Sequence, residues 1–267
     1  MRAAALRAPV QPVMTIPEQL FRLGPLEFDA DRVRGTMITG PWLRGSAASD
    51  GQGHAGTLAV LVDDVLGYAI NAVTGSWSIS TEIGLDIVAP VPVDGSTLYA
   101  ESSVMHIDAV GGLAHGVVRN EAGDTIAHCY QRGRWVDGIP PTETGTRRPV
   151  APTESTEAES LQALLGEAVR ATGAGVSVDV VPRVANPLGN LHGGISLCVA
   201  EWLAASTLPF PGTTASIRAY YIRGVPLGDS VLATPMIQHK GRTYGVVQVT
   251  ASTPTGKPAT ITTVTRH

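Results

Sequence analysis

Asn186-Pro-Leu-Gly-Asn-Leu-His-Gly-Gly194 opens an apolar helix that carries Glu201. A weaker copy lies earlier in the chain, where His54-Ala-Gly56 opens a second apolar helix that carries Asp63. In both copies the acid lies nine residues after the histidine, 54 to 63 and 192 to 201. Two turns, two helices and two acids at equal spacing predict one fold written twice, with a reaction site shared between the copies.

The composition is that of a folded protein with a substantial core. The chain has 267 residues, which allows one large domain or two of about 130. Hydrophobic residues make up 43% and charged residues 16%, which argues against disorder over most of the length. The net charge of −4 argues against nucleic acid or an anionic membrane as a partner.

Neither a secretion signal nor a membrane span is expected. The N-terminus has basic residues but no apolar stretch of signal-core length. The longest apolar candidate, residues 58–73, is interrupted by Asp63 and Asp64, whereas a spanning helix needs roughly 18 consecutive apolar residues. Cys129 and Cys198 lack metal-type spacing, and reduced, buried thiols are favoured over a single disulfide. These features predict a cytoplasmic protein.

A polar linker divides the chain into two parts of similar size. Residues 137–158 are rich in Pro, Thr, Gly and charge and have neither a helical nor a strand period. We therefore expect an N-terminal domain over 1–136, whose first 20 residues form an extension, and a C-terminal domain over 159–267.

Both domains show an apolar helix followed by a long antiparallel sheet. In the first we expect a helix over 57–74 and strands over 35–43, 76–88, 96–108, 113–120 and 125–136. In the second we expect helices over 159–172 and 195–207 and strands over 176–184, 214–223, 230–240, 243–253 and 258–266. Helices that are apolar on most sides must be wrapped, here by a curved sheet, which gives an α+β fold. Charges on such helices are costly unless paired or used, which singles out Asp63, Asp64 and Glu201.

On these residues the chain resembles the PaaI-like acyl-CoA thioesterases of the hotdog superfamily. The resemblance covers most of 176–267, where Asn186, the His-Gly-Gly turn and the acid recur at family spacing. The first half matches less well, because Ala55 replaces the first glycine of the turn and Ala48 stands where the asparagine is expected. The resemblance implies a tandem, or double, hotdog: two antiparallel sheets, each wrapping a long central helix and joined into one continuous sheet as a pseudo-dimer.

The resemblance also implies two unequal sites between the halves, each combining a turn from one half with an acid from the other. The more complete site would hold Asp63, Asn186, His192, Gly193, Gly194 and Ser80. The second site would hold Glu201, His54, Ala55, Gly56 and Thr214, without an asparagine. Of these residues, Asp63, Asn186, His192, Gly193 and Glu201 are expected to be catalytic and the others to contact substrate.

Thioester hydrolysis needs these residue types. The backbone N–H of Gly193 at a helix N-terminus favours a developing oxyanion, and glycine allows close approach of the substrate. Asp63 would act as general base or as nucleophile, with Asp64 as the competing candidate. Asn186 would position water or the acid, and His192 would shape the turn or bond the thioester oxygen.

No metal or redox cofactor is expected, since the remaining histidines lack ligand spacing, and coenzyme A would be part of the substrate. Arg218, Arg223, Lys240 and Arg242 are candidates to meet its phosphates or are simply solvated. A non-catalytic acyl-CoA binder is the alternative function, and an enoyl-CoA hydratase is a third option. The chain is expected as a monomer or as a homodimer of double hotdogs.

Overall fold

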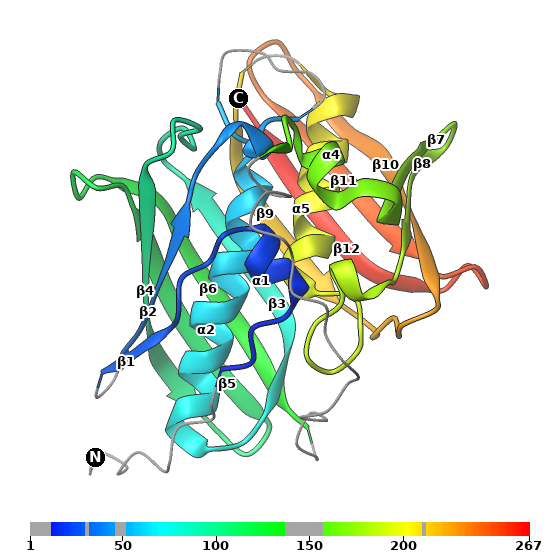
Figure 1. Ribbon diagram of the computed structural model, residues 1–267. Helices are drawn as coiled ribbons and strands as arrows, with labels where there is room; N and C mark the ends of the chain where they lie inside the picture. The colour runs from blue at the N-terminus through cyan, green and yellow to red at the C-terminus, as the bar shows by residue number, and fades with distance from the viewer. Residues whose placement is uncertain (1–11, 30–31, 46–51, 137–156, 210–211) are drawn as a thin grey trace.

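One continuous antiparallel sheet organises the molecule. A computed structural model describes residues 12–29, 32–45, 52–136, 157–209 and 212–267. The sheet has 12 strands in the order β1-β2-β4-β5-β6-β3-β9-β12-β11-β10-β8-β7. Counted outward from the central β3–β9 pair, the strands of the two halves follow in the same order. The two halves of the chain therefore form matching half-sheets that join in the middle (Figure 1). The predicted double hotdog is confirmed.

The strands of the first half are β1 (Glu27–Asp29), β2 (Arg32–Ile38), β3 (Ser78–Ile87), β4 (Thr97–Ile107), β5 (Gly111–Arg119) and β6 (Thr125–Trp135). Those of the second half are β7 (Val169–Thr172), β8 (Gly175–Asp179), β9 (Thr214–Tyr221), β10 (Ser230–Lys240), β11 (Gly245–Ser252) and β12 (Pro258–Arg266). The halves are joined by β3 and β9, paired from Glu82 with Tyr220 to Asp86 with Ser216.

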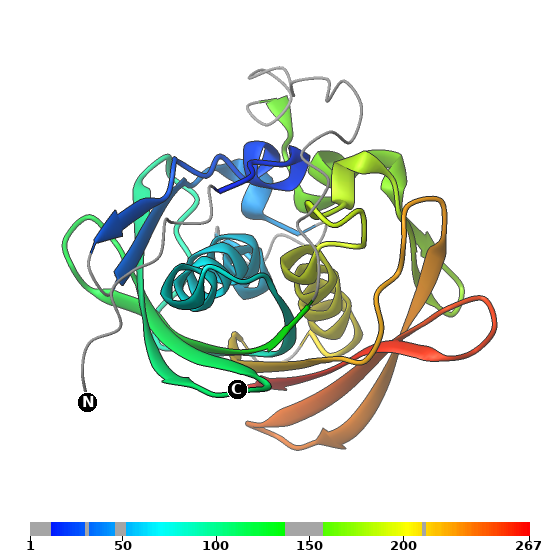
Figure 2. The same cartoon turned by 90° about the horizontal axis from the view of Figure 1, so that it is seen from below.

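Two apolar helices lie side by side on the concave face of this sheet (Figure 2). They are α2 (Ala59–Thr74), which follows a 3-10 turn at Ala55–Leu58, and α5 (Gly193–Thr207). The run Ala55–Thr74 is long and apolar enough to cross a membrane by length and composition, but 83% of its most apolar window is buried within the protein. It is a core helix, which explains its apolar composition on nearly every side.

Gly56 and Gly194, which stand at the same position of the two turns, let the two helices cross closely. A Cβ on Gly194 would lie 2.6 Å from Val60 Cα, and one on Gly56 would lie 3.0 Å from Cys198 Cα. Backbone atoms of a packed helix cannot yield to such contacts, so both turns require glycine at this position. The glycine that the two copies share therefore serves the fold.

Three expected elements were wrong in part. The strand expected over 176–184 ends at Asp179, the last residue of β8, and Pro182 starts a 3-10 turn at Pro182–Val184. Instead of a helix over 159–172, the chain forms the short α4 (Leu161–Leu165), a 3-10 turn and β7. Gly166, at φ +60°, ends α4, because this left-handed conformation interrupts the helix. The strand expected over 35–43 ends at Ile38, and Pro41, which has no N–H to donate to a ladder, starts a 3-10 turn.

Three further predictions concern connecting segments and thiols. Most of the expected linker, 137–156, lies outside the described residues. The expected N-terminal extension contains α1 (Ile16–Leu20), which lies beside the two core helices (Figure 2). Cys129 and Cys198 are both free and buried, and burial raises the pKa of the Cys129 thiol to about 12.

Candidate active site between the two halves

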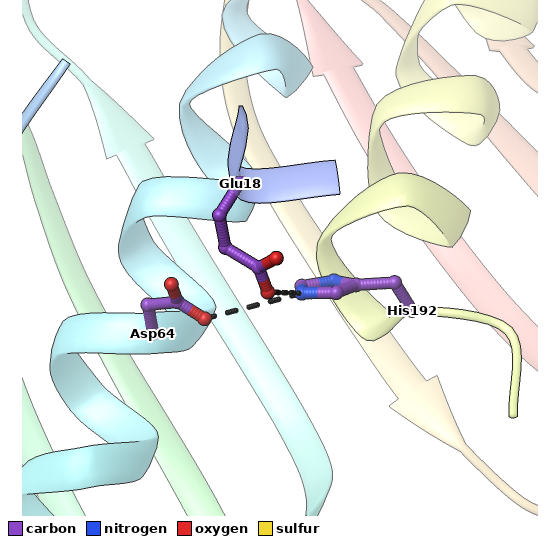
Figure 3. Close-up of side chains that lie close together, drawn as sticks. All are labelled: Glu18, Asp64 and His192. Carbon is purple, nitrogen blue, oxygen red and sulfur yellow. Dashed lines mark hydrogen bonds and ion pairs between the residues drawn. The ribbon is translucent and has the colours of Figure 1, made fainter. Parts of the chain in front are cut away.

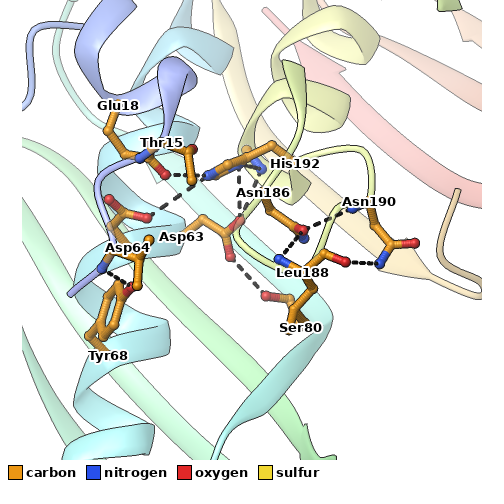
Figure 4. Close-up of polar contacts among 12 residues, drawn as sticks. Thr15, Glu18, Asp63, Asp64, Tyr68, Ser80, Asn186, Leu188, Asn190 and His192 are labelled. Carbon is orange, nitrogen blue, oxygen red and sulfur yellow. Dashed lines mark hydrogen bonds and ion pairs between the residues drawn. The ribbon is translucent and has the colours of Figure 1, made fainter. Parts of the chain in front are cut away.

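The structure brings Asp63 of the first half against the glycine turn of the second half. Asp63 Oδ2 accepts a hydrogen bond of 3.1 Å from the Gly194 N–H, and Oδ1 accepts one of 2.8 Å from the Ser80 hydroxyl. The same N–H lies 3.0 Å from His192 Nδ1, which is itself 3.4 Å from Asp63 Oδ2. Acid, histidine and turn thus form one cluster across the junction of the halves (Figure 4).

Gly193 is placed where a side chain would disturb this cluster. A Cβ on Gly193 would lie 2.7 Å from Asp63 Oδ2. Its N–H opens α5 and has no hydrogen-bond partner in the described part of the chain, whereas its carbonyl accepts a bond of 2.8 Å from the Tyr221 hydroxyl. A free N–H at a helix N-terminus is suited to stabilise negative charge.

His192 is held from the opposite side by an unexpected residue, Glu18 of α1. The ring Nε2 lies 3.2 Å from Glu18 Oε1, and the two side chains are 3% and 1% exposed (Figure 3). Asp64 Oδ1 lies 3.9 Å from the same nitrogen. Three carboxylates, Glu18, Asp63 and Asp64, therefore surround one imidazole.

This charge distribution sets the protonation of the cluster. Burial opposes the charged imidazole, but Glu18, with Asp63 and Asp64, raises the pKa of His192 to about 9. Burial and the nearby Glu18 charge raise the pKa of Asp64 well above its usual range. Burial opposes the charge of Glu18, but hydrogen bonds and attraction from His192 lower its pKa. The cluster favours an ionised Glu18 facing His192 and a neutral Asp64.

A cavity of about 220 Å³ adjoins the cluster and lies between the two halves. One side is formed by α2 and the start of β3, the other by the 186–193 loop and the segment after β9. Its lining includes five of the predicted site residues, Asp63, Ser80, Asn186, His192 and Gly193, and the competing candidate Asp64. The site therefore has both a chemical cluster and space for a ligand.

Asn186 lines the cavity but does not contact the acid. Its Oδ1 accepts hydrogen bonds from the N–H groups of Leu188 and Asn190, at 3.0 and 3.1 Å, and so shapes the loop before His192. Only its Nδ2 remains to meet a ligand. The predicted role in positioning water or acid stays a prediction, and the observed contacts are those of a loop-forming residue.

Gln131 of β6 is a cavity residue that the sequence analysis missed. It is 1% exposed, and its Oε1 has no hydrogen-bond partner in the described part of the chain. A Cβ on Gly67 would lie 3.3 Å from its Nε2, which places the amide one helical turn from Asp63 on α2. An unpaired buried acceptor is costly, so this amide is a candidate to bond a ligand or water.

In the second predicted site the acid makes the same three kinds of contact as in the first, to a histidine, a glycine N–H and a hydroxyl. Glu201 Oε2 lies 3.0 Å from His54 Nδ1 and 3.4 Å from the Gly56 nitrogen, and Oε1 accepts a 2.5 Å bond from the Thr214 hydroxyl. Burial opposes both charges, but mutual attraction raises the pKa of His54 and lowers that of Glu201. Ala55, in the same turn, is buried.

Unlike the first site, this one is filled. Arg266 Nη1 donates to Thr214 Oγ1 at 2.9 Å and lies 3.8 Å from Glu201 Oε1. In the strand register Arg266 pairs with Thr214 as Gly133 pairs with Ser80. An arginine thus occupies the position that glycine leaves open in the first site, and the 220 Å³ cavity does not include Glu201.

Glu18, Asp64 and His192 are also the one group in the described ranges with ligand atoms close enough for a metal ion, all within 4.8 Å of one another. Their contacts fit an ion pair instead. Glu18 Oε1 pairs with the ring, and its Oε2 accepts from the Thr15 N–H and hydroxyl. The expectation of no metal stays a prediction.

Comparisons with known proteins support the fold and part of the assignment. Residues 181–267 match the sequence family described as the acyl-CoA thioesterase N-terminal domain. No curated protein sequence matches the chain. The predicted tandem hotdog fold is confirmed, and its second half matches a thioesterase domain, while the narrower PaaI-like assignment stays a prediction.

Several solved structures resemble the chain over most of its length. A protein described as a "putative thioesterase", from Novosphingobium aromaticivorans, has a TM-score of 0.64 and 15% identity, covering 90% of this chain and 97% of its own. The 12:0-ACP thioesterase from Umbellularia californica has a TM-score of 0.60 and 8% identity, covering 88% and 94%. A hot dog protein of unknown function from Alicyclobacillus acidocaldarius has a TM-score of 0.59 and 11% identity, covering 95% and 97%. At these identities the likeness establishes the fold alone.

Proposed function

We propose that this double hotdog hydrolyses acyl thioesters, with acyl-CoA as the substrate and the cavity between the halves as the site. The observation that carries the proposal is the position of Asp63. Its carboxylate comes from one half, is oriented by the Gly194 N–H of the other half and by Ser80, and lies at the cavity wall. The matched thioesterase domain at 181–267 supports the same reaction.

The free N–H of Gly193 is the proposed oxyanion donor. The thioester carbonyl oxygen gains negative charge as the tetrahedral intermediate forms, and the N-terminus of the 15-residue α5 stabilises that charge. The Tyr221 hydroxyl fixes the Gly193 carbonyl and thereby the turn. One such donor is typically worth about 10²–10³ in rate.

Asp63 is the proposed base for a water molecule, or the nucleophile itself. As base it takes a proton from water while the water oxygen attacks the carbonyl carbon. The C–S bond then breaks, and the proton passes from Asp63 to the leaving thiolate. Ser80 holds the carboxylate during both steps, and Gln131 offers its unpaired Oε1 to the water.

The size of the cavity favours a compact acyl group. About 220 Å³ is below the roughly 300–1,000 Å³ of pockets that enclose drug-sized ligands. Arg223 lines the same cavity with an exposed side chain and supplies positive charge for the phosphates of coenzyme A. We therefore propose short-chain or single-ring acyl-CoAs rather than long-chain ones.

The test is thiol release by the purified chain from acyl-CoAs with short, medium, long and aromatic acyl groups, and from matched acyl-ACPs. The proposal expects the highest kcat/KM for a compact acyl-CoA. Absence of hydrolysis across both sets would refute it. Binding of acyl-CoA by calorimetry without turnover would favour the alternative of a non-catalytic acyl-CoA binder. Faster hydrolysis of acyl-ACP would show that the preferred substrate carries its acyl group on ACP rather than on coenzyme A.

A further inference from the structure

The segment that precedes the first domain's sheet reaches the cavity at two points. The Val13 N–H donates a hydrogen bond of 2.8 Å to the Tyr68 hydroxyl, and Glu18 contacts His192. Tyr68 and His192 both line the cavity, and Figure 4 shows both side chains. A stretch expected to be a mere extension is therefore joined to a side chain of each half at the site.

Glu18 uses both of its carboxylate oxygens. Oε2 accepts from the N–H and the hydroxyl of Thr15, closing the capping box that starts α1. Oε1 faces His192 Nε2. Burial opposes the charge of Glu18, but the hydrogen bond and the attraction from His192 lower its pKa, so the ionised carboxylate can only accept there. A hydrogen bond between these atoms therefore requires a proton on Nε2.

We propose that Glu18 is a positioning residue for the hydrolysis: it keeps the proton of His192 on Nε2, so that Nδ1 remains directed at the Gly194 N–H and Asp63. The inference rests on the proposed function for its kinetic consequence, but the link between Glu18 and the ring is a separate structural claim. Figure 3 shows the carboxylate and the ring nitrogen facing each other from α1 and the start of α5.

The reason lies in the geometry at the other ring nitrogen. The Gly194 N–H is 3.0 Å from Nδ1. Below the raised pKa of about 9 the ring carries a proton on both nitrogens, so Nδ1 accepts this bond once the ring is neutral and keeps its one proton on Nε2. If the neutral ring instead carried its proton on Nδ1, two donors would face each other at that distance. Their repulsion would displace the turn that supplies both the Gly193 N–H and the Gly194 contact to Asp63.

The variant Glu18→Gln tests this with almost no change in shape. A glutamine has a single acceptor oxygen. The N–H and hydroxyl of Thr15 would compete for it with the Nε2–H of His192, and Thr15 offers two donors against one. The amide NH₂ is then left to face Nε2, which must accept, and the ring proton moves to Nδ1. At pH 10, where the wild-type ring is neutral, we expect kcat to fall by roughly 10- to 100-fold with little change in KM, since a catalytic group displaced by about 1 Å can cost 10²-fold.

The direct readout is the ring nitrogens of His192, followed by ¹H–¹⁵N correlation NMR on histidine-labelled protein and assigned with a His192→Asn variant. At pH 10, above the pKa of about 9 for His192, the neutral wild-type ring should show the Nε2–H pattern and Glu18→Gln the Nδ1–H pattern. Glu27→Gln, an exposed glutamate on β1, is the matched control and should change neither the ring nor kcat. Glu18→Asp keeps the charge and both acceptors and should retain the Nε2–H pattern and more of the rate than Glu18→Gln.

Three results would overturn the inference. They are an unchanged ring pattern in Glu18→Gln, a changed pattern with wild-type kcat, or a loss of kcat equal in Glu18→Asp and Glu18→Gln. If Glu18→Gln does not fold, Glu18→Asp and the wild-type ring pattern decide, since a wild-type ring without the Nε2–H proton refutes the link. A wild type without turnover refutes the proposed function, while the NMR arm still reports on Glu18 and His192.

Discussion

The substitution Gly193→Ala should change the geometry of the candidate site while leaving the fold intact. The new Cβ would lie 2.7 Å from Asp63 Oδ2, about 0.7 Å short of ordinary contact at 3.4 Å, and 3.5 Å from Tyr221 Cε1. The atom that must yield is the end of the Asp63 side chain rather than backbone. Gly193 is the first residue of α5, where alanine is up to about 1 kcal/mol better than glycine. We expect a folded protein of nearly unchanged stability whose carboxylate is displaced.

A displacement of this size in a catalytic group lowers kcat by roughly 10²-fold. The assay is the initial rate on the preferred acyl-CoA, normalised to folded protein by urea unfolding. Two controls flank it. Ala55→Gly makes the matching change in the filled site and should leave kcat unaltered. Gly194→Ala drives a Cβ to 2.6 Å from Val60 Cα, and overpacking of this kind costs typically about 1–3 kcal/mol of stability. A Gly193→Ala protein with kcat/KM within threefold of wild type would refute the reasoning.

Two further predictions follow from buried polar groups. The pKa of His192 is raised from 6.5 to about 9 in the folded protein. The charged ring therefore contributes about 3 kcal/mol to the free energy of unfolding. This contribution is fully present below pH 6.5 and is lost as the pH rises through 9. Urea unfolding at pH 6 and 9.5 should show that loss in wild type and a smaller one in His192→Asn, and equal losses would contradict it. Gln131→Leu removes an unpaired buried acceptor, so the free energy of unfolding should stay equal or rise while kcat/KM falls about tenfold; unchanged kcat/KM would exclude Gln131 from the reaction.

The fold was largely predictable because its signals are local and occur twice. Two apolar helices with a histidine turn at one end and an acid nine residues later indicate the same unit in both halves. The failures were local as well. The alternation at Val169–Thr172 was read as helix, although Gly166 ends α4 and the following residues pair with β8.

The pairing of each acid with the opposite turn was implied by a family resemblance, and the structure places the residues accordingly. The contact of Glu18 with His192 spans the chain and leaves no periodic trace in sequence. The Thr15-x-x-Glu18 capping box predicts a helix start there but not its partner. The closure by Arg266 depends on strand register, because only pairing shows that it stands where the first half has Gly133. The sequence does not show that the Asn186 Oδ1 is used by its own loop, and the predicted role of this residue stays a prediction.

The central claim is that one site per chain hydrolyses thioesters and that its acid is Asp63. The most direct measurement compares kcat for Asp63→Asn and Glu201→Gln, each normalised to folded protein. Loss of a general base should reduce kcat about 10²–10⁴-fold in Asp63→Asn. Glu201→Gln breaks a buried ion pair and should lose stability but keep kcat within a few fold, because Glu201 is 1% exposed and lies outside the cavity. Near wild-type turnover in Asp63→Asn, with the main loss in Glu201→Gln, would contradict the account.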